Sequence, residues 1–302
     1  MSAKICFTMI VFNGDYVLKE NLESIYPFAD SIIISEGPVK HYQKLGFTSS
    51  TDKTVEIIEN FPDPEGKIKL LQGQWASKDA MCDAHTAHLT GDFVWHVDSD
   101  ELYKPEDMEM VIKYLTDHDD CYSMAFKLRS FYGGLDRYIS GFEENFEVHR
   151  IQRIIPGQSK WLTHRPPTMI WPPTGKKCRD MGHVDFHTTD SWGIRIYHYS
   201  HVFPTQVKAK MNYYYQRDPN GIIQDYWNSL YVPWMRANTE AEKLQIEQPT
   251  KGVQEWLPHR RGPAFTKKFE GIHPKSIQDA IPQLEKRINE EKVRLGVNYD
   301  NR

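Results

Sequence analysis

Residues 93–101 of this 302-residue chain read Phe-Val-Trp-His-Val-Asp-Ser-Asp-Glu. A short apolar run of this kind is typical of a strand that is buried on both faces. The run passes directly into Asp98-Ser99-Asp100-Glu101, so several carboxylates follow one strand end. In open α/β sheets, ligands bind beyond the carboxyl ends of the strands. We therefore expect these carboxylates to border a ligand site.

Similar apolar runs occur throughout the first 130 residues. Together with Phe93–Val97 they predict strands over Ile5–Val11, Ser31–Ser35, Ile68–Leu71 and Cys121–Leu128. Helix-like segments with N-terminal capping residues or a first-turn proline lie between them, at Thr54–Asn60, Lys78–Leu89 and Glu106–Leu115. This alternation predicts an α/β fold with a mostly parallel central sheet flanked by helices.

The pattern changes after residue 130. Gly133-Gly134 can close a hairpin, and residues 156–193 are rich in Pro, Gly, Trp and His with little periodicity, which predicts a long irregular segment. Helical patterns return from Gln206 to the C-terminus. We therefore predict one domain over residues 1–203, with parts 1–130 and 131–203, and a helical extension over 204–302 packed on it.

Composition excludes several protein classes. The 37 basic and 41 acidic side chains leave a net charge of −4, which does not suit a general nucleic-acid binder. No apolar run reaches the length of a membrane span, and the first residues lack a cleavable signal pattern. The 4 cysteines are well separated and form no C-x-x-C, so a disulfide framework is not expected. We expect a cytoplasmic protein.

The clustered carboxylates after residue 97 favour a metal ion. Acidic groups this close repel one another unless a cation neutralises them, and carboxylate oxygens suit Mg²⁺ or Mn²⁺. A bare D-x-D is a weak signal, since Asp117-His118-Asp119 has the same spacing at the polar end of a predicted helix. A solvated turn is the other interpretation of Asp98 and Asp100, and the surrounding sequence must decide between them.

Several ordered segments of the chain resemble the family 2-like glycosyltransferases of the GT-A fold, in a bacterial and viral subset. FTMIVFNGDYVLKENLESIYPFADSIIISEG (7–37) looks like the family's first strand, loop, helix and second strand. TSSTDKTVEIIENF (48–61) is similar to its S-T-D-x-T stretch, and ASKDAMCDAHTAHLTGDFVWHVDSDE (76–101) to its helix, strand and D-x-D metal motif. IYHYSHVFPTQVKAKMNYY (196–214) resembles a His-containing strand and helix of the subset. The resemblance covers about residues 4–215.

The resemblance implies a metal-dependent hexosyltransferase-type enzyme of glycan biosynthesis. It would move a sugar from a nucleotide-sugar, with a UDP-sugar favoured, to a glycan or other hydroxyl acceptor, with inversion. Residues 1–130 would hold the donor and residues 131–203 the acceptor. The donor-binding residues implied are Asn13, Glu36, Lys78, Asp98 and Ser99. The second predicted strand ends in Glu36-Gly37 rather than the paired aspartates commoner in the family, so the contact with the base departs from that pattern.

The same resemblance implies a Mn²⁺ or Mg²⁺ ion held by Asp98, Asp100 and a downstream histidine, for which His198 is the first choice and His201 the second. Zinc is an alternative, because His183-x3-His187 and His198-x2-His201 have ligand-like spacing. Neither pair lies on an evident helix, where both rings would converge, and this argues against zinc at these pairs.

An inverting transfer needs a base for the acceptor hydroxyl. Family spacing points to Asp185, whereas the HRPP segment offers His164, with Arg165 where related sequences often carry an acid. The two rank equally. A Mg²⁺-dependent nucleotidyltransferase is an alternative, although VFNGDYV is not a glycine- and lysine-rich phosphate loop. An inactive sugar- or nucleotide-binding protein of the same fold is another.

Overall fold

The computed structural model describes residues 2–297, which form two compact units. Unit 1 contains residues 2–127, 147–196 and 274–277, and unit 2 contains residues 128–146, 197–273 and 278–297. The chain therefore passes between the units several times. In this division, residues 128–146 and 197–203 group with the helical C-terminal part. The domain boundary at residue 203 stays a prediction.

The sheet of unit 1 has the strand order β6-β8-β4-β1-β2-β3. Its strands are β1 (Ile5–Val11), β2 (Ser31–Glu36), β3 (Ile68–Gln72), β4 (Phe93–His96), the first half of β6 (Ser123–Tyr132) and β8 (Glu147–Arg153). β1 pairs in parallel with both β2 and β4, and β2 pairs in parallel with β3. β8 is antiparallel to both β4 and β6. The predicted α/β class and mostly parallel sheet are confirmed.

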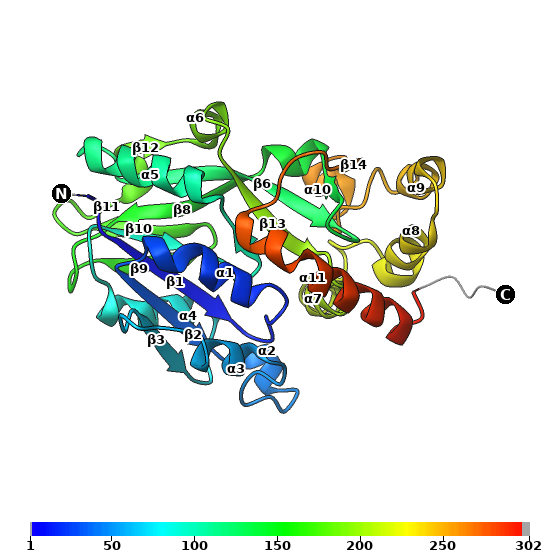
Figure 1. Ribbon diagram of the computed structural model, residues 1–302, viewed down its shortest axis with the longest axis horizontal. Helices are drawn as coiled ribbons and strands as arrows, with labels where there is room; N and C mark the ends of the chain where they lie inside the picture. Colours follow the sequence, from blue (N-terminus) through cyan, green and yellow to red (C-terminus); the bar gives the residue numbers. More distant parts are fainter. Residues whose placement is uncertain (1, 298–302) are drawn as a thin grey trace. The chain divides into compact units, whose positions relative to one another are not determined.

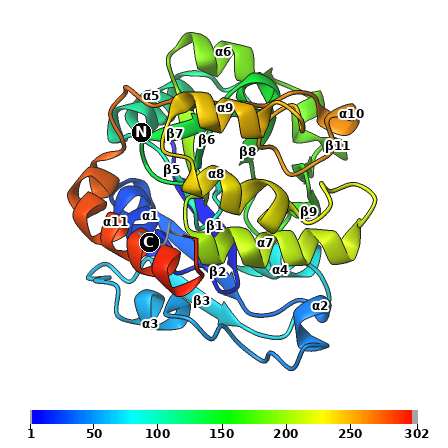
Figure 2. The same ribbon diagram turned by 90° about the vertical axis from the view of Figure 1, so that its right-hand side faces the viewer.

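Helices flank this sheet (Figures 1 and 2). Those of unit 1 are α1 (Leu18–Ile25), α2 (Lys40–Gln43), α3 (Thr54–Glu59), α4 (Lys78–His85), α5 (Pro105–Asp117) and α6 (Phe186–Ser191). In Figure 2, α1 and α4 lie on opposite sides of β1 and β2. The helix predicted over Lys78–Leu89 ends at His85 and continues as a short 3-10 turn, Thr86–His88.

An aromatic core fixes the end of β4. Trp95 is fully buried, and its ring stacks on Phe7 at 5.3 Å and on Phe126 at 6.0 Å between centroids. Tyr103 meets the same ring edge-on at 4.9 Å. Each such pair contributes on the order of 1 kcal/mol beyond the burial of its area. The strand that carries the acidic residues therefore ends on a rigid base.

The prediction of a long irregular segment over residues 156–193 is wrong, because this segment contains short strands. These are β9 (Lys160–His164), β10 (Pro167–Trp171), β11 (Lys176–Lys177) and β12 (His183–Val184). β9, β10 and β11 form an antiparallel sheet. The prolines and glycines of this segment include those at the turns, such as Pro166 between β9 and β10 and Gly175 (φ 69°) between β10 and β11. They interrupt the periodicity without preventing the strands.

Unit 2 contains a hairpin and several helices. The hairpin joins the second half of β6 to β7 (Arg137–Ile139), with Phe131 opposite Tyr138, as Gly133-Gly134 predicted. Gly133 has a φ of 71°, and a Cβ there would lie 2.2 Å from the Trp234 ring. The other elements are β13 (Arg195–His201, shared with unit 1), β14 (Thr266–Lys268), α7 (Pro204–Arg217), α8 (Val232–Arg236), α9 (Glu240–Glu247), α10 (Pro258–Arg261) and most of α11 (Lys275–Arg294).

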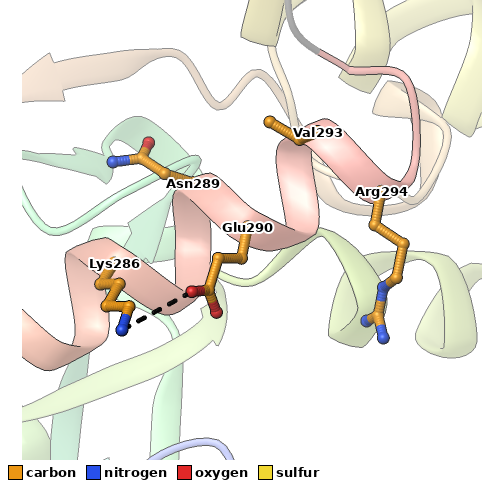
Figure 3. A pocket seen from close by; sticks show the side chains of 5 residues that line it. All are labelled: Lys286, Asn289, Glu290, Val293 and Arg294. Carbon is orange, nitrogen blue, oxygen red and sulfur yellow. Dashed lines mark ion pairs between the residues drawn. The ribbon is translucent and has the colours of Figure 1, made fainter.

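The last helix, α11, presents a solvated face, as its sequence predicted. Lys286 and Glu290 face each other one turn apart with their charged atoms 3.9 Å apart (Figure 3). A shallow hollow on this face is lined by Lys286, Asn289, Glu290, Val293 and Arg294. All five residues come from one helix, and their polar groups do not converge on a common point (Figure 3). The hollow therefore offers no candidate site.

Two predictions about the chain's chemistry can also be compared with the structure. All 4 cysteines are buried and free, so no disulfide framework is present. Within residues 2–297, no helix combines the length and the apolar character needed to cross a membrane.

Candidate functional site

The carboxylates that follow β4 lie in a tight turn, Asp98–Glu101, which we call the acidic turn. The Glu101 N–H donates to the Asp98 carbonyl at 3.0 Å. The side-chain amide of Asn21, fully buried on α1, donates to the same carbonyl at 3.2 Å and also to the Glu101 carbonyl. The backbone of the turn is thus held from α1, while Asp98, Ser99 and Asp100 remain partly exposed.

A buried arginine on β8 faces the acidic turn. The Arg150 guanidinium donates to Asp98 Oδ2 at 2.8 Å and also to the Glu101 carboxylate. The register between β6 and β8 shifts at Met124/Ala125, which leaves Arg150 as an extra residue between the pairs on either side of it. Such bulges bend a strand and redirect a side chain. The shifted register thus places Arg150 where its side chain reaches the acidic turn.

Burial controls the charges of this group. Burial raises the pKa of Glu101, and the Arg150 guanidinium opposes this rise because it stabilises the ionised carboxylate. Burial also works against the charge of Arg150, but Glu101 and Asp98 hold the pKa of the guanidinium above its usual value. One guanidinium thus contacts two carboxyl groups, and Asp100 adds a third carboxyl group to the same turn.

His96, the last residue of β4, is neutral. It is almost fully buried, and burial lowers its pKa to about 3. Its Nδ1 lies 3.2 Å from Thr8 Oγ1 on β1, and its Nε2 lies 3.9 Å from Asp98 Oδ1, beyond hydrogen-bond distance. A neutral imidazole adds no positive charge beside Asp98, so Arg150 supplies the cationic partner that contacts this carboxylate.

The loop after β1 is joined to the S-T-D loop that precedes α3. Asn13, with a φ of 49°, accepts the Thr51 N–H on Oδ1 at 2.7 Å, and its own N–H donates to Ser50 Oγ at 2.9 Å. Glu36, buried at the end of β2, accepts the Ser50 N–H at 2.8 Å. The structure thus brings Asn13 and Glu36 to one loop, where both carry structural hydrogen bonds. Their contact with a nucleotide stays a prediction.

The acidic turn also reaches the β1 loop. A Cβ on Gly14 would lie 2.7 Å from Ser99 Oγ and 2.7 Å from Val11 Cγ2, so only glycine fits without a shift of its neighbours. The Gly14 N–H donates to Thr54 Oγ1 at 2.8 Å, at the start of α3. Asn13, Glu36 and Ser99, predicted separately from the sequence, therefore belong to connected loops at one edge of the sheet.

A histidine–aspartate pair joins β9 to α4. His164 Nδ1 lies 3.0 Å from Asp79 Oδ1, which also accepts the His164 backbone N–H at 2.8 Å. Burial lowers the pKa of His164, although Asp79 raises it, and Asp98 is near enough to act on it electrostatically. Lys78, the first residue of α4, is partly buried and carries a further positive charge near this pair. His164 therefore lies within electrostatic range of the acidic turn.

Asp185 has a clear local role. It is the N-cap of α6, and its Oδ1 accepts the Thr188 N–H at 2.8 Å. Hydrogen bonding by Thr188 lowers the pKa of the Asp185 carboxyl. This role is the one expected of an aspartate at the start of a helix. Among residues 2–297, no hydrogen-bond partner of Asp185 would raise its basicity, and its place as the base stays a prediction.

His198 and His201 both lie on β13, in the part that belongs to unit 2. His198 Nδ1 lies 3.1 Å from Ser130 Oγ. His201 is buried, with Nδ1 3.1 Å from Ser200 Oγ and Nε2 3.2 Å from Glu255. Asp98 and Asp100 belong to unit 1, so the metal set completed by His198 stays a prediction. Neither predicted zinc pair lies within one helix, as expected.

Sequence reasoning missed Arg150, Asp79 and Asn21. A charged residue in the strand-like EVHRIQR was the one available signal for Arg150, since a strand buried on both faces rarely carries an unpaired charge. Asp79 and Asn21 sit in ordinary helical contexts, and their partners lie 85 and 77 to 80 residues away in the sequence. No local pattern could have found them.

Comparison with known families supports the resemblance seen in the sequence. Residues 48–172, less than half of the chain, match the family described as Glycosyl transferase family 2. The similarity to this family thus extends over that part of the chain. The matched region runs from the S-T-D loop through the acidic turn to β10, and so includes His164 and Arg150. Among curated proteins, no relative matches this chain.

Solved glycosyltransferase structures are similar to part of this chain. S. aureus TarS 1–349 in complex with UDP-GlcNAc matches at 18% identity and a TM-score of 0.33, over 43% of this chain and 36% of that one. The mannosyltransferase PcManGT of Pyrobaculum calidifontis, in complex with GDP-Man and Mn²⁺, matches at 15% identity and a TM-score of 0.35. The match covers 43% of this chain and 36% of that one.

Glucosyl-3-phosphoglycerate synthase of Mycobacterium tuberculosis, in complex with Mn²⁺, UDP and glucosyl-3-phosphoglycerate, matches at 17% identity and a TM-score of 0.32. The match covers 43% of this chain and 44% of that one. The chain thus spans less than half the length of each of these structures.

Proposed function

We propose that this protein is a glycosyltransferase, which transfers a sugar from a nucleotide-sugar, with a UDP-sugar favoured, to a hydroxyl of a glycan or other acceptor. The proposal rests on the position of the acidic turn in the sheet. β1 lies between β2 and β4, so the chain reverses its direction of progress across the sheet there. Ligands of open α/β sheets bind at such a switch point, beyond the carboxyl ends of the strands. The acidic turn and the β1 loop both lie at that edge.

A divalent cation forms part of the proposal. Asp98 and Asp100 offer carboxylate oxygens from a partly exposed turn, which fits Mn²⁺ or Mg²⁺. His198 is our candidate for a further ligand. When bound, the ion supplies charge that offsets the developing negative charge of the diphosphate leaving group.

Asn13, Glu36, Lys78 and Ser99 remain our candidates for donor binding. Asn13 and Glu36 shape the loops beside the acidic turn, and Lys78 offers a cation for the phosphates. Asn21 and Arg150 act as positioning residues, because they hold the backbone of the turn and the Asp98 carboxylate. Residues beyond 130 would bind the acceptor.

Of the two candidate bases, the geometry favours His164. Asp79 accepts from Nδ1, which leaves Nε2 as the basic nitrogen of the neutral imidazole. Such a His–carboxylate pair is suited to accept the proton of an acceptor hydroxyl while the bond from the sugar to the diphosphate breaks. Asp185 is held as a helix cap with a lowered pKa. Inversion of the anomeric centre and a cytoplasmic location belong to the proposal as well.

A thermal-shift screen with UDP-, GDP-, dTDP- and CMP-sugars, each with and without Mn²⁺, identifies the donor, since ligands that bind the native state raise its melting temperature. Release of nucleoside diphosphate from that donor is then measured for Asp100→Ala and for Asp119→Ala. Asp119 is the matched control, because it belongs to the other D-x-D of the chain. We expect activity to be lost only in Asp100→Ala.

Retained activity in Asp100→Ala would contradict the proposal. Release of pyrophosphate would favour the nucleotidyltransferase alternative, and absence of any Mn²⁺-dependent shift in the screen would favour the inactive binding protein.

A further inference from the structure

A second group of metal-binding side chains lies in unit 1, outside the acidic turn. Glu147 and His149 on β8 and His183 on β12 present ligand atoms that all lie within 4.8 Å of one another. Glu147 Oε1 is 3.3 Å from His183 Nε2, and Glu147 Oε2 is 3.7 Å from His149 Nε2. The two imidazole rings stack with centroids 5.1 Å apart. We call these three residues the His-Glu cluster.

Strand β6 brings the cluster together. His149 pairs with Ala125 on one side of β6, and His183 pairs with Ser123 on the other. Ser123 and Ala125 lie two residues apart, so they point to the same face of the sheet. Both side chains are small, which leaves room above β6 for the two imidazoles to meet. The cluster is therefore a product of the register of three strands.

The surroundings orient the ligands. Ser123 Oγ lies 2.6 Å from His183 Nδ1, which directs Nε2 of that ring toward Glu147. A hydrogen bond to the other ring nitrogen is the usual way in which a protein fixes a metal-binding histidine. His149 is only 9% exposed, and its Nδ1 has no hydrogen-bond partner among the described residues. The interaction that compensates the burial of this ring must come from its Nε2 side, where Glu147 lies.

The spacing and the ligand types point to one class of ion. Ligand atoms bound at 2.0–2.1 Å to a tetrahedral Zn²⁺ lie about 3.3 Å from one another, close to the 3.3 Å and 3.7 Å observed in the cluster. Two imidazole nitrogens with one carboxylate suit Zn²⁺, whereas Mg²⁺ and Mn²⁺ prefer oxygen ligands such as those of the acidic turn. We propose that Glu147, His149 and His183 bind one Zn²⁺ ion.

Access to the cluster agrees with this proposal. The side chains of Glu147 and His183 are 33% and 19% exposed, so an ion can reach them from solvent. Three protein ligands leave the fourth position of a tetrahedral ion open to water or to a ligand.

Metal binding is tested on the full chain after removal of metals with a chelator. Co²⁺ serves as the spectroscopic probe, because a four-coordinate Co²⁺ ion with nitrogen ligands absorbs visible light, and Zn²⁺ is then titrated in to displace it. We expect one Co²⁺ per chain with such a band, and its loss when one equivalent of Zn²⁺ is added. Ser123→Ala removes the hydrogen bond to His183 and should weaken Zn²⁺ binding about 10- to 100-fold.

The ligand variants are Glu147→Gln and His183→Gln, which keep the size of the side chain nearly unchanged. Both should abolish the visible band, while circular dichroism shows that the fold is retained. His187→Ala and Asp100→Asn are the controls and should keep it, since neither residue belongs to the cluster. Absence of the band in the unmodified protein, or an unchanged band in the folded Glu147→Gln and His183→Gln variants, would overturn the proposal. The cluster would then be a His183–Glu147 ion pair only.

Discussion

The guanidinium of Arg150 lies 2.8 Å from the Asp98 carboxylate and also contacts the Glu101 carboxylate. One buried cation on β8 therefore forms ion pairs with two acidic residues that follow β4. Arg150 and Glu101 are 5% and 1% exposed. Removal of one partner from a buried ion pair leaves the other charge uncompensated, which typically costs about 3–5 kcal/mol. The pair therefore has a role in stability as well as in positioning.

The first prediction concerns this group. Arg150→Met should lower the free energy of unfolding by about 3–5 kcal/mol, measured by urea denaturation. Arg150→Met combined with Glu101→Gln should recover part of that loss, because the buried carboxylate is then neutral. A double variant as unstable as the sum of the two single variants would show that Arg150 and Glu101 are not coupled.

The contact between Gly14 and Ser99 gives a second prediction. Gly14→Ala places a methyl group 2.7 Å from Ser99 Oγ and from Val11 Cγ2, so the acidic turn or the β1 loop must move. We expect weaker Mn²⁺-dependent donor binding, at least tenfold by isothermal titration with the donor found in the thermal-shift screen.

Replacement of Ser99 by glycine in the same protein should restore part of that affinity, because one of the two close contacts disappears. Unchanged affinity in Gly14→Ala would mean that the donor does not depend on this part of the acidic turn.

The third prediction separates the two candidate bases. His164→Ala should lower kcat by about 10²–10⁴-fold, the range for loss of a general base, and Asp185→Asn should change it by only a few-fold. Asp79→Asn should fall between them, because Asp79 orients the imidazole but does not take the proton. The reverse order of His164 and Asp185 would assign the base to the cap of α6.

The pH profile gives a separate check on His164. An imidazole acts as a base only when it is neutral, so activity should fall as the pH drops through its pKa. Burial lowers the pKa of His164, which places the acid limb of kcat/KM below the ordinary histidine value of about 6.5. A limb above that value would exclude His164 as the titrating group.

Two buried histidines predict loss of stability in acid. Burial lowers the pKa values of His85 and His96 to about 3, whereas the unfolded chain binds protons near pH 6.5. Their contribution is therefore complete above pH 6.5 and is lost progressively between pH 6.5 and 3, at about 1.4 kcal/mol per pH unit for each histidine. In His85→Asn, the free energy of unfolding should fall less steeply between pH 6.5 and 5. An equal slope in both proteins would contradict this account.

Much of the fold could be read from local patterns. The apolar run at Ile5–Val11 matches β1, and the strand predicted at Phe93–Val97 ends one residue later than β4. The hairpin predicted from Gly133-Gly134 is present between β6 and β7. The short strands between residues 156 and 193 escaped prediction, because they are two to five residues long and separated by prolines and glycines. A strand that short has too few residues for alternation to be visible.

Local sequence patterns located β1 to β4 and showed that carboxylates follow β4, because hydrophobic periodicity and strand ends are properties of neighbouring residues. The groups that those carboxylates contact depend on the tertiary structure. Arg150 reaches Asp98 across 52 residues of chain, and Asp79 reaches His164 across 85. The His-Glu cluster depends on both neighbours of β6. Such contacts follow from strand register, and a single extra residue in β8 changes which side chains face one another.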